Sequence, residues 1–422
     1  MTTPSGPSDA DMEDYYRRFL PFRYLFQWLS HSPKVTTDFT KREIAYELRG
    51  DIYQRYQSYG SEKEFKQAVE KSNPLRFEIG AIYNVFPKDR KVLPKSALKP
   101  VAKELNFDID LTDYDPIRTC CQDKAICRKC WKFIKVASNI IDTALRDDFG
   151  FKHILWVFSG RRGAHCWVSD ARARNLDDLS RQALIAYFDV LGGEKRIKKP
   201  YHPALERAFE ICKLEFDEII LHEQDPWNTK TKATPHIDAN VEELLEFMPE
   251  KELRDALKAK WDKTPSSSLD KWKDINKVAA ELFGKNKFKL TSVIDAKKDI
   301  IIRYLYPRLD VNVSRQLNHL LKSPFCIHPA TGNVCVPFDP FHSLLDEDPT
   351  DYGFDPVTSP KLAEIQQEAE NNKSSSSDAW DATSLKPYVA YFGKFVTNLY
   401  KEELHDRKRS ADDDAGEDDL MF

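Results

Sequence analysis

Two aspartates in an alternating stretch of the chain point to the first candidate site. Apolar residues occupy every second position from Leu105 to Leu111, and Asp108 and Asp110 fall between them. Period two is typical of a half-buried strand, so both carboxylates stand opposite the core. They repel each other unless a cation lies between them, and Mg²⁺ or Mn²⁺ binds carboxylates together with substrate phosphates. The pair predicts a metal site for phosphoryl or nucleotidyl transfer; the alternative is a solvated strand face that carries acids.

A short glycine- and arginine-rich turn complements the two aspartates. The segment 159–163, Ser-Gly-Arg-Arg-Gly, separates two apolar runs, which indicates a strand, a turn and a second strand. Glycines let a ligand approach the backbone, and Arg161 and Arg162 carry planar donors that match phosphate oxygens. The alternative is a hairpin with an exposed basic tip. Because the turn follows the aspartate strand, it supplies the second half of a nucleotide site, with arginines facing the triphosphate.

Four cysteines lie between these two motifs, at Cys120, Cys121, Cys127 and Cys130. Two close pairs suit a tetrahedral Zn²⁺ bound by four thiolates, although adjacent cysteines do not form the common zinc knuckle. A redox pair or buried thiols are the alternatives. Four protein ligands leave Zn²⁺ no open coordination position, so we expect a structural site.

Alternation also predicts the strands that position further candidates. One hairpin spans 43–58 and carries Tyr53 and Arg55 on one face, and another strand spans 76–83. An arginine on a strand is usually a solvated or paired surface residue, and only its neighbourhood can make it a phosphate ligand. His165 can face the same site as the two arginines, although a lone histidine is more often structural.

A second polar set appears late in the chain, before and after a helix expected over 315–321. Such a set, flanked by apolar residues, is either a buried network or a site. Its members are Arg308, Asp310, Asn312, Lys322 and His328.

Composition narrows the class of protein. The chain has 422 residues, of which 41% are hydrophobic, enough for a substantial core and two or three structural units. Lys and Arg number 64 against 68 Asp and Glu, and six of those acids lie in the last eleven residues, so any nucleic-acid surface must be a local patch. No apolar run approaches the roughly 18 residues that span a membrane, and the N-terminus lacks an apolar signal region. We expect a soluble, intracellular protein without a membrane partner.

The periodicity divides the chain into parts. We expect an α/β catalytic core from residues 11–175 and 298–404, with the zinc motif at 120–130 inside it. Helical spacing dominates 176–297, which indicates an inserted helical subdomain for substrate support or partner contact. Residues 1–10 and the acidic segment 405–422 are expected to be disordered.

The combination of motifs resembles a known family. Phe-Asp-Ile-Asp-Leu-Thr-Asp-Tyr-Asp at 107–115, Ser-Gly-Arg-Arg-Gly-x-His-Cys-Trp at 159–167 and Pro-Arg-Leu-Asp-x-Asn-Val-Ser at 307–314 appear in order, with the cysteines between the first two and Leu-Lys-Ser-Pro-Phe-x-x-His-Pro at 321–329. The chain is similar, from about Tyr15 to Leu404, to the small, catalytic subunit of eukaryotic DNA primase, in the archaeo-eukaryotic primase superfamily. One departure is the basic segment 87–103, which we interpret as loop variation.

The resemblance implies roles for individual residues. Asp108, Asp110 and Asp310 match the family's metal-binding carboxylates, and the four cysteines match its structural zinc site. The residues that match the family's triphosphate contacts are Ser159, Arg161, Arg162, His165, Lys322 and His328. Further N-terminal site residues are Glu43, Tyr53 and Arg55, of which Arg55 is expected to contact the nucleotide.

The resemblance also implies a fold, an activity and partners. The fold is a mixed-sheet α/β catalytic core with an inserted helical subdomain. The activity is synthesis of short RNA primers from ribonucleoside triphosphates on single-stranded DNA, with two Mg²⁺ or Mn²⁺ ions. The partners are a large, iron–sulfur-containing primase subunit and the DNA polymerase alpha complex, in the nucleus. The alternatives are a primase-like repair or translesion polymerase and a nucleic-acid-binding scaffold without catalysis.

Overall fold

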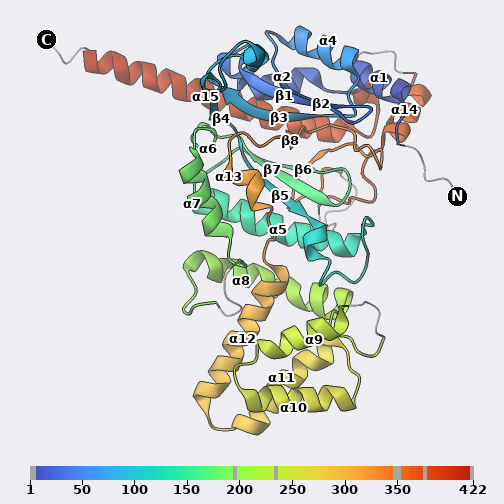
Figure 1. Ribbon diagram of the computed structural model, residues 1–422, viewed down its shortest axis with the longest axis vertical. Coiled ribbons are helices and arrows are strands. Elements are labelled where there is room, and N and C mark those ends of the chain that lie inside the picture. The colour runs from blue at the N-terminus through green and yellow to red at the C-terminus, as the bar shows by residue number, and fades with distance from the viewer. Residues whose placement is uncertain (1–5, 193–196, 232–235, 346–352, 374–377, 419–422) are drawn as a thin grey trace.

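Two β-sheets and a separate group of helices make up the computed structural model (Figure 1). It describes residues 6–192, 197–231, 236–345, 353–373 and 378–418. The chain contains both helices and β-sheets, so the predicted α/β class is confirmed. Every strand pair among these residues is antiparallel, so the expectation of a mixed sheet is corrected to two antiparallel sheets. Among the described residues, every helix is too short or too polar to cross a bilayer.

The first sheet has the strand order β2-β1-β3-β4, and β8 from late in the chain also pairs with β3. Its strands are β1 Arg42–Leu48, β2 Ile52–Gln57, β3 Arg76–Tyr83, β4 Pro100–Ala102 and β8 Leu321–Lys322. The hairpin and the strand over 76–83 are therefore where alternation predicted them. The pairing of β8 with β3 brings Lys322 opposite Glu78.

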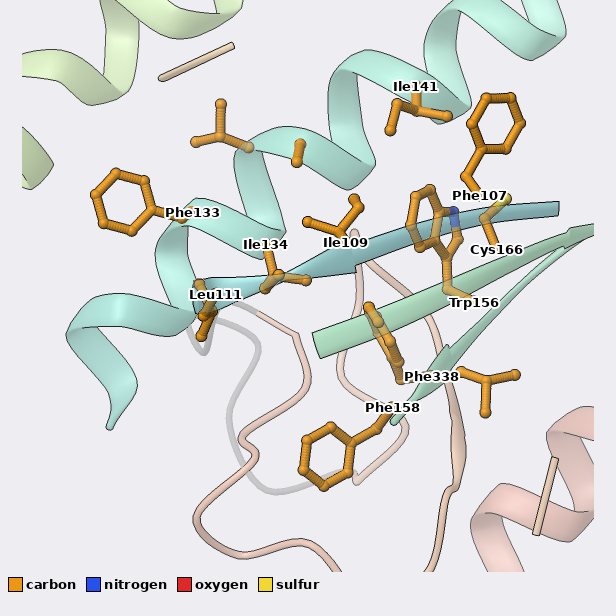
Figure 2. Packing of buried hydrophobic residues seen from close by; sticks show 14 of the residues in the cluster. Phe107, Ile109, Leu111, Phe133, Ile134, Ile141, Trp156, Phe158, Cys166 and Phe338 are labelled. Carbon is orange, nitrogen blue, oxygen red and sulfur yellow. The ribbon is translucent and has the colours of Figure 1, made fainter. Parts of the chain in front are cut away.

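The second sheet has the order β5-β7-β6-β9 and packs against helix α5, Arg128–Asp147 (Figure 2). Its strands are β5 Leu105–Asp110, β6 Ile154–Phe158, β7 Gly163–Val168 and β9 Pro337–Phe338. Phe107 and Ile109 are fully buried on the side of β5 that faces α5. Since side chains alternate along a strand, Asp108 and Asp110 project from the opposite face, as period two predicted.

Helices surround the two sheets at the upper end of Figure 1 and form the lower end alone. The helices before β6 are α1 Asp9–Arg18, α2 Phe22–Ser30, α3 Thr37–Thr40, α4 Glu62–Ser72, α5 and the 3-10 turns η1 Pro87–Lys91, η2 Lys95–Ala97 and η3 Leu111–Tyr114. Those after β7 are α6 Ala171–Arg174, α7 Asp178–Phe188, α8 Pro203–Phe216, the π-helix η4 Asp217–Gln224, α9 Ile237–Glu246, α10 Lys251–Lys263, α11 Ser268–Phe283 and α12 Lys287–Leu305. Helix α12 runs through residue 297, where a boundary was expected.

The last elements are α13 Val311–Arg315, α14 Leu362–Asn371, η5 Ala379–Ala382 and α15 Lys386–Asp418. The helix expected over 315–321 was misplaced, since α13 lies earlier in the chain. The Asp310 side chain accepts a hydrogen bond from the Asn312 N–H and so caps the start of α13.

Helices reach into both segments that were expected to be disordered. Helix α1 begins at Asp9 with a capping box formed by Ser8 and Asp11, so disorder over 1–10 is wrong for residues 6–10. Helix α15 continues to Asp418, into the acidic segment 405–422, because an established helix extends without a new nucleation penalty. Residues 1–5 and 419–422 lie outside the described residues.

Candidate active site and metal centre

The antiparallel pairing of β5 with β7 places the first two motifs face to face. Asp108 lies opposite His165, and Asp110 lies opposite Gly163. The Nε2 of His165 is 3.7 Å from a carboxylate oxygen of Asp108. A Cβ at position 163 would lie 2.4 Å from the Ile109 carbonyl oxygen, so glycine is what allows the arginine turn to approach the aspartate strand this closely.

Asp310 reaches this pair from two hundred residues away in the chain. Its backbone N–H donates to the Asp108 carbonyl at 3.1 Å, and α13 packs on β5. Burial, and then the charges of Asp110 and Asp310, raise the pKa of Asp108 to about 7. Three mutually repelling carboxylates are the donor set that hard divalent cations prefer, so these residues fit Mg²⁺ or Mn²⁺.

A basic set lies beside the carboxylates. Arg162 Nε donates to Asp110 at 3.1 Å, which ties the turn directly to the aspartate strand. The buried Lys322 donates a hydrogen bond from its Nζ to the Ser159 carbonyl. The Ser159 hydroxyl accepts a hydrogen bond from the Gly163 N–H at 3.0 Å. The half-buried Arg161 has no ion pair with a described carboxylate, so its charge is available to a ligand.

The turn needs its other glycine as well. Gly160 has φ +85°, which favours glycine, and a Cβ there would lie 2.6 Å from the Cβ of His328. Its carbonyl accepts from Thr331 at 2.7 Å and from Asn333 at 3.0 Å. The segment after Lys322 therefore packs against the turn and brings His328 to it.

Both histidines of the candidate site are neutral at physiological pH. Burial, with the nearby charges of Lys322 and Arg76, lowers the pKa of His165 to about 3. Burial, Lys322, Arg161 and Arg76 lower the pKa of His328 to about 3. The buried Nδ1 of His165 has no hydrogen-bond partner among the described residues, so it can bond to a ligand.

Two of the N-terminal candidates, Glu43 and Arg55, differ in what they can do: Glu43 holds Arg55, and Arg55 can contact a ligand. Glu43 is fully buried and accepts two hydrogen bonds from Arg55, at 2.8 and 3.1 Å, and one from the Tyr83 hydroxyl at 3.0 Å. Arg55 also donates to the Asn318 carbonyl at 3.2 Å, next to the segment that bears Lys322. Glu43 is thus occupied in fixing Arg55, and it is Arg55 that is placed to meet a ligand.

Tyr53 lies farther out and leads to a residue that the sequence did not reveal. Its exposed side chain donates to Glu78, which also pairs with Arg76 at 3.3 Å and lies opposite Lys322 in the sheet. The alternation of 76–83 marks Glu78 as surface-facing, but only the pairing of β3 with β8 brings it to the basic set.

Arg308 was noted in the sequence only as part of a polar set. It is largely buried, donates to the Asp113 carbonyl at 2.7 Å, and its guanidinium lies 5.3 Å from the centre of the Tyr114 ring. It thereby fixes the turn η3 that follows the aspartate strand. The adjoining cleft has a volume of about 650 Å³, and its polar lining includes Asp108, Asp110, Thr112, Asp113, Asp189, Arg303, Arg308, Asp310 and Asn312.

The four cysteines form one cluster at the start of α5. The Sγ atoms of Cys120, Cys121, Cys127 and Cys130 lie within 4.8 Å of one another. Among the described residues no other group of ligating side chains converges as closely, so the carboxylate set is the looser of the two. A hydrogen bond from Cys120 lowers the pKa of Cys130 to about 5 against the effect of burial, and the Cys127 N–H and Arg118 add to this. Four thiols with one already acidic fit Zn²⁺.

Comparisons with known proteins show the family to which the chain belongs. The family model for the DNA primase small subunit matches residues 107–340. The DNA primase small subunit of Saccharomyces cerevisiae (strain ATCC 204508 / S288c) is 46% identical in an alignment of 426 positions that covers 99% of this chain and 98% of that one. The DNA primase small subunit of Schizosaccharomyces pombe (strain 972 / ATCC 24843) is 44% identical, over 96% of this chain and 93% of that one.

A solved structure, the polymerase domain from Mycobacterium tuberculosis ligase D in complex with DNA, covers 89% of this chain and 92% of its own. Its TM-score is 0.35 at 11% identity, and no argument rests on it. The two relatives and the family model, which spans more than half of the chain, show that this chain belongs to the DNA primase small subunit family and thus to the nucleotidyltransferases.

Proposed function

We propose that this chain synthesises short RNA primers on single-stranded DNA by two-metal nucleotidyl transfer, for replication initiation and lagging-strand synthesis. One observation carries the proposal: the 3.1 Å hydrogen bond from the Asp310 backbone N–H to the Asp108 backbone carbonyl. This bond supports a position for the third carboxylate near the other two, beside a group of cationic side chains. Carboxylates for the ions and cations for a triphosphate are the two halves that nucleotidyl transfer requires.

Each half has its own residues. Asp108, Asp110 and Asp310 would hold two Mg²⁺ or Mn²⁺ ions, which when bound activate a ribose 3′-hydroxyl and stabilise charge on the α-phosphate. Arg161 and Lys322 carry positive charge to the place where the leaving pyrophosphate gains negative charge.

The remaining residues orient the nucleotide. Arg162 donates through Nε to Asp110 and through Nη1 to the Asp123 carbonyl, so its Nη2 can reach a phosphate oxygen. The neutral His165 offers its unpartnered Nδ1, and His328 and Ser159 lie at the same turn. Arg55, fixed by Glu43 and with Tyr53 nearby, approaches from the first sheet. The cleft beside the carboxylates leaves room for the growing strand.

We further propose the assembly in which this activity is used. The relatives are named small subunits, which supports a large subunit as partner. By the resemblance, that subunit contains an iron–sulfur centre and joins the DNA polymerase alpha complex in the nucleus. The four-cysteine cluster is proposed to bind structural Zn²⁺, since four thiols surround one position.

The test of the mechanism is Asp110→Ala. Loss of a metal ligand should lower primer synthesis roughly a thousandfold, equivalent to about 4 kcal/mol in the transition state. Synthesis is measured with labelled ribonucleotides on an unprimed single-stranded template. The matched control is Asp255→Ala, an exposed acid on α10, which should retain full synthesis. Synthesis retained by Asp110→Ala, at an unchanged melting temperature, would contradict the metal assignment.

The same assay separates the repair-polymerase alternative. The purified chain should incorporate ribonucleotides on an unprimed template, because a primase begins a strand without a primer. A strong preference for deoxyribonucleotides would favour a primase-like repair or translesion polymerase. The scaffold alternative predicts no incorporation at all, and the presence of all three carboxylates argues against it.

A further inference from the structure

We propose that the loop bearing the cysteines positions the Arg162 guanidinium through one contact, the backbone carbonyl of Asp123. We call residues 115–130 the cysteine loop. The inference rests on the proposed function, because it takes Arg162 as a ligand of the nucleotide. It gives the cysteine loop a part in nucleotide binding in addition to holding a metal, and it makes Asp123 a positioning residue.

The Arg162 guanidinium donates hydrogen bonds to two different acceptors. Arg162 Nε donates to Asp110 at 3.1 Å, and Nη1 donates to the Asp123 carbonyl at 3.1 Å. Its Nη2 makes no hydrogen bond with any residue that the structure describes. Because the guanidinium is planar, fixing two of its nitrogens fixes the direction in which the third points. Asp123 therefore sets the orientation of the donor that remains for a phosphate oxygen.

The Asp123 carbonyl is itself fixed from within the loop. Arg118, which is buried, donates to it through Nη2 at 3.2 Å and to the Ala125 carbonyl through Nη1 at 2.9 Å. The same Nη1 lies 4.0 Å from the sulfur of Cys130, and Nε donates to Asp115 at 3.0 Å. One side chain thus connects the cysteine cluster with the carbonyl that Arg162 contacts.

Losing the Asp123 contact would affect both halves of the site. A guanidinium tethered only by Asp110 favours the two-bonded pairing that arginine makes with a carboxylate. In that arrangement Arg162 would cover a carboxylate that is needed for a divalent ion, and fewer of its donors would face a phosphate. The cysteine loop prevents this by providing a second, uncharged acceptor on the other side of Arg162.

The backbone at Asp123 allows the contact to be tested without removing any side-chain bond. Asp123 has φ +50°, in the left-handed region, and its side chain is exposed. Glycine adopts this conformation freely, whereas a β-branched residue is strongly disfavoured there. Asp123→Gly should therefore keep the carbonyl in place, and Asp123→Val should displace it, although both variants lose the same carboxylate.

The experiment measures equilibrium binding of ATP with Mg²⁺ to the full-length chain, together with zinc content and melting temperature. We expect Asp123→Val to weaken ATP binding by about tenfold, from the cost of a β-branched residue at positive φ, and Asp123→Gly to stay within about twofold of the natural chain. Zinc content should be unchanged in both. In primer synthesis, the valine variant should raise KM more than it lowers kcat. Asp123→Ala, with a smaller expected effect, replaces the valine variant if the latter loses zinc.

Arg162→Ala supplies the decisive background. If Asp123 acts through Arg162, Asp123→Val should have no further effect on ATP binding once Arg162 is alanine. An additive effect, or equal binding by the valine and glycine variants, would overturn the positioning role. If Arg162→Ala binds ATP as well as the natural chain does, the assignment of Arg162 as a nucleotide ligand fails instead, and the two failures are distinguishable.

Discussion

Asp108 is a carboxylate whose pKa is strongly shifted by its surroundings. Burial and two neighbouring acids raise its pKa to about 7, whereas an aspartate in the unfolded chain titrates near 3.8. Between these values the folded state binds the proton that the unfolded state has released, so this group favours folding less and less as pH rises from about 4 to 7. A divalent cation at the site would displace the same proton.

This sign gives a prediction for Asp108→Asn. Without added Mg²⁺, the variant should be more stable than the natural chain at pH 8, by about 2 kcal/mol, because it removes a repelled charge. The difference should shrink as pH falls and disappear below about pH 4, where Asp108 carries a proton in the unfolded state as well. Thermal melting across this range checks the prediction, with Asp255→Asn as the exposed control. Equal melting temperatures at pH 8 would contradict the raised pKa.

The residues of the candidate site that could be predicted are those whose pattern lies within a short stretch of sequence. Asp108 and Asp110 follow from period two, and the cysteine cluster follows from close spacing. Asp310 was assigned only by resemblance, since no local pattern says which distant strand it joins. Glu78 was missed because its position depends on a strand pair that joins residues more than two hundred apart.

At the scale of elements, a buried charge network ties the two sheets together. Arg42 on β1 donates two hydrogen bonds, at 2.6 and 2.9 Å, to Glu104, the residue immediately before β5. The side chains of Arg42, Glu104 and His31 are all fully buried. His31 lies 3.1 Å from the same carboxylate. Removing one partner would leave a charge buried without compensation, which is far more costly than losing an exposed pair.

We therefore predict that Arg42→Met lowers the free energy of unfolding by roughly 3–5 kcal/mol. Arg49→Met, which breaks the exposed pair with Asp9, should cost about 1 kcal/mol or less. Urea denaturation followed by circular dichroism compares the two. If both variants lose the same stability, the network does not hold the sheets together.

Strands were easier to predict than the limits of helices. Alternation located β1, β2, β3 and β5, although β2 has no fully buried residue and β1 is buried on both faces over its first five residues. The helix near Asp310 was misplaced because its start depends on a cap that also serves the site. The extension of α15 depends on a helix that tertiary packing has already established, which composition does not reveal.

For the whole molecule, the cysteine loop lies between the sheets and the helical region. Gln224, buried at the end of η4, accepts from the Thr119 N–H at 2.8 Å, and its amide nitrogen donates to the sulfur of Cys120 at 3.4 Å. The helices after β7 thus contact the candidate metal centre directly. This contact joins residues more than a hundred apart, so the sequence did not predict it.

Removal of the metal should accordingly lower the thermal stability of the folded chain. We predict that zinc chelation, or Cys127→Ser, lowers the melting temperature by roughly 5 °C or more, because metal binding stabilises only the folded loop. Cys212→Ser, at a buried thiol outside the cluster, controls for the loss of a sulfur atom. Unchanged melting after chelation would mean that the cluster binds no stabilising metal.

The hydrogen bond from Asp310 to Asp108 also has a consequence for synthesis of the chain on the ribosome. The strand with the first two carboxylates is complete when just over a quarter of the sequence has been translated, but Asp310 is added only after nearly three quarters of it. A nascent or prematurely ended product that stops after Gly163 and before Asp310 would contain the 159–163 turn and the four cysteines and yet lack the third proposed metal ligand. On the proposed mechanism, such fragments would not begin a strand.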